Sequence, residues 1–170
     1  PTVEKKFKDQ RGSCQLFADY WIKLKQKVEK KIAVPEDKID NWNRDLSLQR
    51  AFDNLISNED RHQNQILITK DWRMILIDHS RSFRNSRTSK KLIYTATHPE
   101  GPKLMTEIPR SLYEKVKTLT AADVKAATGP YLTDEEIANL MLRRDLIVAE
   151  IAKIKKVETV YLNTFVSKGA

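Results

Sequence analysis

The sequence predicts a mainly helical α+β fold in which small β-hairpins accompany several helices. Apolar residues recur every three or four positions in several long segments, which is typical of amphipathic helices. Pairs of short apolar or alternating segments are separated by polar turns, which indicates hairpins. The chain has 170 residues with 40% hydrophobic and 32% charged residues, the composition of an ordinary globular chain with room for one core.

The N-terminal part predicts a hairpin followed by a helix. Residues 2–8 partly alternate and residues 13–18 form a short apolar run, and Gly12 separates them. Two paired strands are therefore expected. Residues 19–33 carry apolar side chains at helical spacing with lysines on the other face, and Pro35 ends this predicted helix.

A second helix and a second hairpin are predicted in the middle of the chain. Residues 42–57 form the helix, whose inner face we expect to comprise Leu46, Gln49, Phe52 and Ile56. The hairpin consists of residues 66–68, a polar turn at 69–71 and residues 72–77. The helix therefore delivers the chain directly to a polar loop at the open end of the hairpin.

The C-terminal part predicts three more helices and a strand. The helices are expected at residues 109–119, 120–129 and 134–156, and the strand at residues 157–166. Thr133 and Glu136 have the spacing of a capping box at the start of the longest helix. Its buried stripe is expected to comprise Ile137, Leu140, Met141, Ile147, Ile151 and Ile154.

Cysteine content, apolar run length and charge bear on whether the chain is a disulfide-bonded, membrane-spanning or nucleic-acid-binding protein. The single cysteine, Cys14, excludes an internal disulfide and favours a reducing, cytoplasmic compartment. No apolar run reaches the roughly 20 residues that cross a bilayer, so no transmembrane segment is expected. The net charge is +8, but the lysines are dispersed and no recognition motif accompanies them, so nucleic-acid binding ranks last among the readings.

Two acidic residues, Asp60 and Asp78, each follow an apolar segment, on either side of the central hairpin. Because a hairpin brings its ends together, we expect both carboxylates to lie near the amide of Asn64 or Gln65. This set is typical of phosphoryl transfer, in which one carboxylate takes the proton of the nucleophile while the amide and the second carboxylate hold a divalent metal.

The charge of Asp78, at the end of an apolar strand, requires a partner. A metal ion is one candidate, and the structural alternatives are Arg61, Arg73 and Arg81. Other chemistries lack support in the sequence. The three histidines do not have the spacing of a zinc site, no nucleophile elbow surrounds Ser80, and no glycine-rich phosphate loop is present.

Residues 51–62 and 75–83 resemble the catalytic core of the atypical kinases. The pattern D-x-L-I-x-N-x-D-R-H followed by I-D-H-x-x-x-F is similar to that of phosphatidylinositol kinases, HipA-type bacterial kinases and the secreted casein-kinase-like family. The similarity covers roughly residues 50–84, with both halves at the expected separation. It implies a protein-kinase-like C-terminal lobe that works with ATP and Mg²⁺ or Mn²⁺.

The resemblance implies a role for each polar residue of the motif. Asp60 matches the catalytic aspartate that orients or deprotonates the acceptor hydroxyl, and Asp78 matches the aspartate that holds metal on the phosphates. The metal-binding amide usually lies five residues after the catalytic aspartate. That position is Gln65 here, and Asn64 lies one residue earlier.

Four further residues are expected to support this loop. By the same resemblance, Asp53 and Asn58 brace the loop from the preceding helix, while Arg61 and His62 lock its conformation.

The resemblance also predicts how the chain is divided. Residues 1–18 correspond to the end of an N-terminal lobe and the hinge, with Gln15, Leu16 and Phe17 near the nucleotide, and residues 19–170 to the C-terminal lobe. The chain would then be a fragment of a longer kinase whose N-terminal lobe is its partner. The acceptor is open between protein, lipid and small molecule, and the alternative is a non-catalytic pseudokinase or scaffold module.

Overall fold

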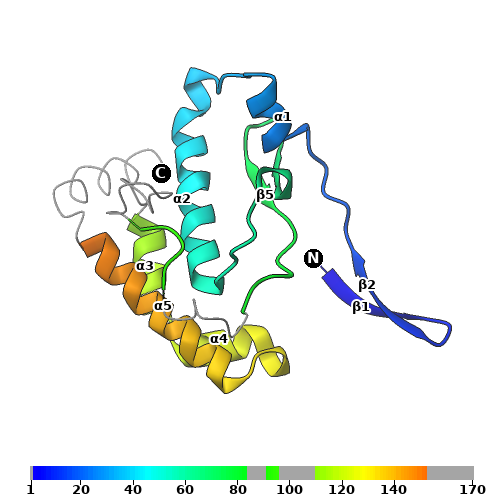
Figure 1. Ribbon diagram of the computed structural model, residues 1–170, viewed down its shortest axis with the longest axis vertical. Coiled ribbons are helices and arrows are strands. Elements are labelled where there is room, and N and C mark those ends of the chain that lie inside the picture. The colour runs from blue at the N-terminus through cyan, green and yellow to red at the C-terminus, as the bar shows by residue number, and fades with distance from the viewer. Residues whose placement is uncertain (1, 84–90, 96–109, 153–170) are drawn as a thin grey trace.

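A computed structural model describes residues 2–83, 91–95 and 110–152. A little over half of the described residues are helical, and the strands form two small antiparallel sheets (Figure 1). The predicted α+β, mainly helical class is therefore confirmed. The strand predicted at residues 157–166 and the end of the last helix, with Ile154, lie outside the described residues.

The first sheet is a hairpin of β1 (Thr2–Phe7) and β2 (Gln10–Gln15) that extends away from the helices (Figure 1). The hairpin was predicted, but its turn lies at residues 8–9 rather than at Gly12. Gly12 pairs with Lys5 inside the ladder instead. All side chains described in the two strands are exposed, so this hairpin has little packing of its own.

The second sheet has the order β3 (Ile22–Lys23), β4 (Ile66–Ile68) and β5 (Met74–Leu76). Its β4–β5 hairpin was predicted, whereas the helix expected over residues 19–33 is only α1 (Leu24–Glu29). The first part of that prediction was wrong because Ile22 pairs with Ile68, a partner more than 40 residues away that local periodicity does not reveal.

Helix α2 (Ile39–Ile56) follows the 3₁₀ turn η1 (Glu36–Lys38) and packs against β5 and the last helix. Its buried side is unusually polar and comprises Asp45, Ser47, Gln49, Asp53 and Asn54 together with Ala51 and Ile56. Gln49 and Ile56 are buried as expected, but Phe52 is 37% exposed. The helix ends at Ser57, which has a left-handed φ of 54°.

Three helices complete the described fold. They are α3 (Arg110–Thr118), α4 (Ala121–Thr128) and α5 (Asp134–Ala152), with the 3₁₀ turn η3 (Gly129–Tyr131) between the last two. Helix α5 contacts α2, α3 and α4, and its buried apolar residues are Ile137, Leu140, Ile147 and Ile151. The predicted capping box is confirmed, since the Glu136 N–H donates to Thr133 Oγ1 at 3.2 Å and the Thr133 N–H donates to Glu136 Oε2 at 2.7 Å.

Apolar packing is divided between the helices and the second sheet. Two clusters join the helices, one around Ile147 and Ile151 and one around Leu132 and Leu140. A third cluster joins β3 and β4 to Trp72, whose ring also contacts Trp21 and Trp42. This tryptophan contact fixes the turn end of the β4–β5 hairpin against α2, leaving the opposite end for the polar loop.

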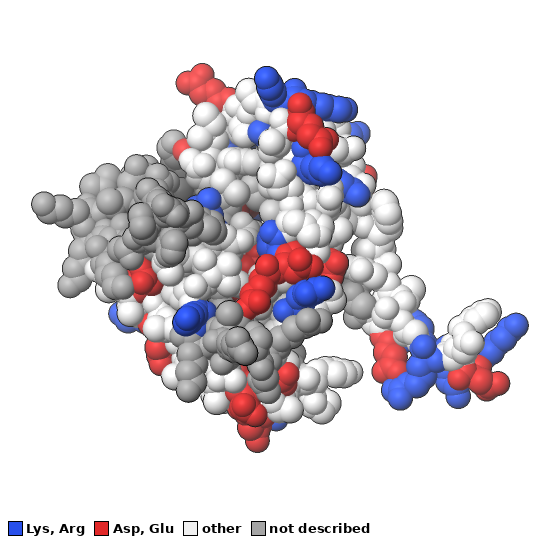
Figure 2. All heavy atoms as spheres, in the orientation of Figure 1, with Lys and Arg blue, Asp and Glu red and all other residues white. Residues whose placement is uncertain are grey.

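The surface charges are mixed on the face seen in Figure 2, where a group of acidic side chains lies near the centre and the basic side chains do not form one patch. None of the described helices has the length and apolarity that crossing a bilayer requires. For this part of the chain, the finding agrees with the expectation of no transmembrane segment.

Candidate functional site

The β4–β5 hairpin brings Gln65 and Asp78 together. The 3₁₀ turn η2 (Gln63–Gln65) leads into β4, and the Ile77 N–H donates to the Gln65 carbonyl at 3.0 Å after β5. The amide of Gln65 then donates from Nε2 to Asp78 Oδ2 at 3.1 Å. The pairing register thus delivers the contact between the amide and the second carboxylate that the sequence predicted.

A buried ion pair fixes the loop to α2. Arg61 donates from Nε and Nη2 to the two carboxylate oxygens of Asp53, both at 3.0 Å, and the two side chains are 1% and 0% exposed. A bidentate pair of this kind holds the planar guanidinium in one orientation. Asp53, on α2, therefore also fixes the direction in which the remaining N–H groups of Arg61 point.

Those remaining donors hold both strand ends. Arg61 Nη1 donates to the carbonyls of Ile77 and, at 3.4 Å, of Gln65. Its Nη2 lies 2.8 Å from Nδ1 of His79. One side chain thereby connects α2, the start of β4 and the residues that follow β5.

Asp53 also anchors the beginning of the loop. Its carboxylate accepts from Gln49 Nε2 at 2.6 Å and, more weakly, from Asn58 Nδ2 at 3.4 Å. Asn58 Oδ1 in turn accepts from the Asp60 N–H at 3.3 Å. These are the contacts that a bracing role for Asp53, Asn58 and Arg61 requires, and their part in catalysis stays a prediction.

Asp60 is partly exposed at the end of this loop. Its carboxylate is 47% exposed and lies 3.6 Å from Nε of Arg81, which is itself 57% exposed. An exposed pair at this distance is weak. The carboxylate of Asp60 is therefore open to solvent, with Arg81 beside it.

Asp78 is exposed rather than buried, so the expectation that its charge requires a partner was wrong. Among the described residues, Arg61 pairs with Asp53, Arg73 with Asp45 and Arg81 with Asp60, and no arginine forms an ion pair with Asp78. Its Oδ1 accepts from the Ser80 hydroxyl at 2.6 Å and from the Ser80 N–H at 3.3 Å. These hydrogen bonds, with that from Gln65, lower the pKa of Asp78. Its backbone has a φ of 57°, a left-handed conformation that aspartate tolerates better than most residues.

The oxygen donors at this end of the hairpin suit a hard cation such as Mg²⁺ or Mn²⁺. Gln65 accepts from the His62 N–H through Oε1 at 3.3 Å while its Nε2 contacts Asp78. A cation between Gln65 and Asp78 would need the Gln65 amide turned over, so that its oxygen faces Asp78 and the His62 N–H loses its acceptor. Asn64 and the His62 ring are exposed. Among the described residues, no three His, Cys, Asp or Glu side chains form a metal-binding group.

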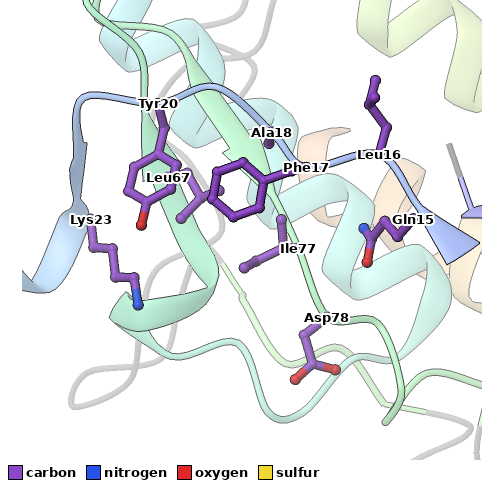
Figure 3. Close-up of a pocket in the computed structure, with 9 residues that line it drawn as sticks. All are labelled: Gln15, Leu16, Phe17, Ala18, Tyr20, Lys23, Leu67, Ile77 and Asp78. Atoms are coloured by element: carbon purple, nitrogen blue, oxygen red, sulfur yellow. The ribbon is translucent and has the colours of Figure 1, made fainter.

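A pocket of about 450 Å³ opens beside Asp78 (Figure 3). Its lining comprises Gln15, Leu16, Phe17, Ala18, Tyr20, Lys23, Leu67, Ile77 and Asp78. Figure 3 shows the Phe17 and Tyr20 rings beside Leu67 and Ile77, with Lys23 and Asp78 on opposite sides. The three residues that the sequence assigned to nucleotide binding thus lie in the same pocket as the predicted metal ligand Asp78.

The sequence did not single out Lys23 and Tyr20, because residues 19–33 were interpreted as a helix. Their position in the pocket follows from the extended segment before α1 and from the pairing of β3 with β4. The signal that could have identified Tyr20 as a pocket residue was its position just after the apolar run of the predicted hinge.

None of the protein-family models, curated proteins and solved structures with which this chain was compared matches it.

Proposed function

We propose that this chain is the C-terminal lobe of an atypical kinase that transfers the γ-phosphoryl group of ATP to a hydroxyl. The observation that carries the proposal is the pocket, which joins Gln15–Ala18 to Asp78 through the floor formed by Leu67 and Ile77. The pocket thus places the predicted hinge residues beside the second half of the motif, more than 50 residues later in the sequence.

The lining of the pocket suits a nucleotide. A volume of about 450 Å³ lies in the range of small-molecule sites, roughly 300–1,000 Å³. Phe17, Leu67 and Ile77 offer apolar surface for a purine ring, and Lys23 and Gln15 offer polar groups. Asp78 is then the residue nearest to a metal–triphosphate group.

Asp60 takes the proton of the acceptor hydroxyl in this proposal, and Asp78 with Gln65 or Asn64 holds Mg²⁺ or Mn²⁺. The bound cation would neutralise charge on the phosphates. Asp53, Asn58, Arg61 and His62 keep the loop in place. The proposal includes a second lobe that covers the phosphates, and it places the protein in the cytoplasm. The acceptor of the phosphoryl group is a protein, a lipid or a small molecule.

Calorimetric titration with ATP, with and without Mg²⁺, tests the nucleotide and metal roles. We expect Asp78→Asn to abolish the Mg²⁺-dependent part of the affinity. Asp60→Asn should leave ATP affinity within about twofold and lower turnover by about 10²-fold or more, because general-base catalysis contributes about 10²–10⁴-fold. Asp71→Asn, at the opposite, turn end of the β4–β5 hairpin, is the matched control.

A specific observation favours a second candidate, a pseudokinase that binds nucleotide as a scaffold. The Gln65 oxygen is engaged by the His62 N–H, and Arg81 lies against Asp60. ATP binding without turnover in a wild-type protein that also carries the lobe covering the phosphates supports this candidate over the enzyme. If ATP does not bind, or binds Asp78→Asn and wild type alike, both kinase-like readings fail.

A further inference from the structure

A second pocket, of about 320 Å³, lies between α2, α3 and the residue that precedes β5. It is lined by Arg44, Asp45, Leu48, Arg73, Ser111, Leu112 and Lys115, none of which lines the proposed nucleotide pocket. Three of these side chains are cationic and one is anionic, which leaves two positive charges in excess. The composition favours an anionic ligand.

Asp45 does not neutralise Arg44 or Lys115, because both of its carboxylate oxygens are bonded to Arg73 and to the backbone of Met74. The residue is 5% exposed, and Oδ2 accepts from both Arg73 Nε and the Met74 N–H at 2.9 Å. Its Oδ1 accepts from Arg73 Nη2, also at 2.9 Å. The guanidinium of Arg73 is thereby held in one plane, while its side chain stays 55% exposed and keeps Nη1 for another partner.

Arg44 and Lys115 supply the excess charge. Within the described residues, neither forms a hydrogen bond or an ion pair. They extend from different helices, α2 and α3, into one pocket with the Ser111 hydroxyl. Leu48 and Leu112 add apolar surface beside these donors.

We propose that this pocket binds a phosphate dianion, either free or as a small monoester. A charge of about −2 matches the two excess positive charges, and a planar guanidinium with an ammonium group is a common phosphate-binding combination. The leucines suit the carbon portion of an ester. The proposal is independent of the kinase assignment, since it uses no residue of that site.

A ligand in this pocket would affect the stability of the β4–β5 hairpin through its contact with Arg73. The ligand shares the Arg73 guanidinium with Asp45, and Asp45 also holds the backbone of Met74, the first residue of β5. The occupied pocket should therefore stabilise the turn end of the hairpin.

Titrations of the whole chain with inorganic phosphate and with O-phosphoserine at constant ionic strength, followed by amide NMR, test the proposal. We expect saturable shifts at Ser111 and Arg73, and a loss of about tenfold in affinity in both Lys115→Ala and Arg44→Ala, because each removes a hydrogen bond to a charged group. Lys117→Ala is the matched control, since Lys117 lies on the same helix but outside the pocket. All three variants change exposed or partly exposed side chains, and circular dichroism verifies their folding.

Tighter binding of phosphoserine than of phosphate, abolished by Leu112→Ala, would identify a monoester as the ligand, and equal affinities would identify free phosphate. The proposal is overturned if Lys115→Ala and Lys117→Ala bind equally well, which indicates general surface charge. It is also overturned if the shifts occur only at Lys23 and Asp78, or if saturation is not approached.

Discussion

Arg61 shows how one side chain sets the geometry of the candidate site. Its guanidinium joins the Asp53 carboxylate to the carbonyls of Gln65 and Ile77 and to the His79 ring. A buried ion pair adds little net stability when formed, but removing one partner leaves the other charged and desolvated. The main role of Arg61 is therefore to fix the conformation of the loop, rather than to add net stability through its ion pair.

Replacing Arg61 with Met tests this dependence. We expect the free energy of unfolding to fall by about 3–5 kcal/mol, because the variant leaves Asp53 buried without its partner. Denaturant unfolding measures the change. The control is Arg81→Met, whose exposed pair with Asp60 should cost no more than about 1 kcal/mol. Equal losses in the two variants would contradict the role assigned to Arg61.

His79 gives the site a predictable response to pH. Partial desolvation, followed by the nearby Arg61 cation, lowers its pKa, and these effects outweigh the opposite influence of Asp53 and Asp78. The ring also contacts Phe52 edge-on. Since arginine only donates, Nδ1 must accept from Arg61, which is consistent with a neutral ring.

The free energy of unfolding should therefore fall as the pH drops below about 6.5, the ordinary histidine pKa, toward the lower pKa of the folded chain. In that window the unfolded chain binds more protons than the folded one. Well above pH 7 the residue contributes no pH dependence. NMR titration of the His79 ring measures its pKa, and unfolding curves of wild type and His79→Asn measure the pH dependence of the free energy of unfolding. If that free energy falls with acid as steeply in the variant as in wild type, His79 is not the cause.

At the scale of elements, helices with conventional apolar faces could be predicted, whereas α2 could not be predicted in full. Ile137, Leu140, Ile147 and Ile151 of α5 are buried at the positions that periodicity indicated. In α2, Asp53 is buried because Gln49, one turn earlier, and Arg61, in the loop that follows, donate to its carboxylate. The periodicity of apolar residues cannot identify such polar partners, although the resemblance implied that Asp53 braces the loop from the preceding helix.

The capping box of α5 carries a local prediction. Thr133→Ala removes the acceptor of the Glu136 N–H, so we expect the free energy of unfolding to fall by about 1 kcal/mol. Thr133→Ser, which keeps the hydroxyl, is the matched control and should lose a few tenths at most. Thermal and denaturant unfolding of the two variants provide the comparison, and similar losses would show that the hydroxyl is not what stabilises this end.

At the scale of the whole molecule, the described residues differ sharply in how much packing supports them. Ile68 in β4 is 0% exposed and Trp72 in the turn between β4 and β5 is 8% exposed, whereas Phe7 in the first hairpin is 77% exposed. An isolated two-stranded hairpin is marginally stable. Yet β2 leads directly into the segment that forms one wall of the pocket beside Asp78, the proposed nucleotide site.

Amide hydrogen exchange should reveal this difference. We expect amides of β1 and β2 to exchange with little protection, while those of Leu67 and Ile68 exchange only through global unfolding, because protection follows packing. If ATP with Mg²⁺ binds as proposed, protection should rise at residues 15–18, since a purine between Phe17 and Ile77 holds that segment against the sheet. A rise confined to β4 and β5 would place the ligand elsewhere. Strong protection of β1 and β2 without nucleotide would indicate that another surface already covers the hairpin, and its dependence on protein concentration would show whether that surface is a second copy of the chain.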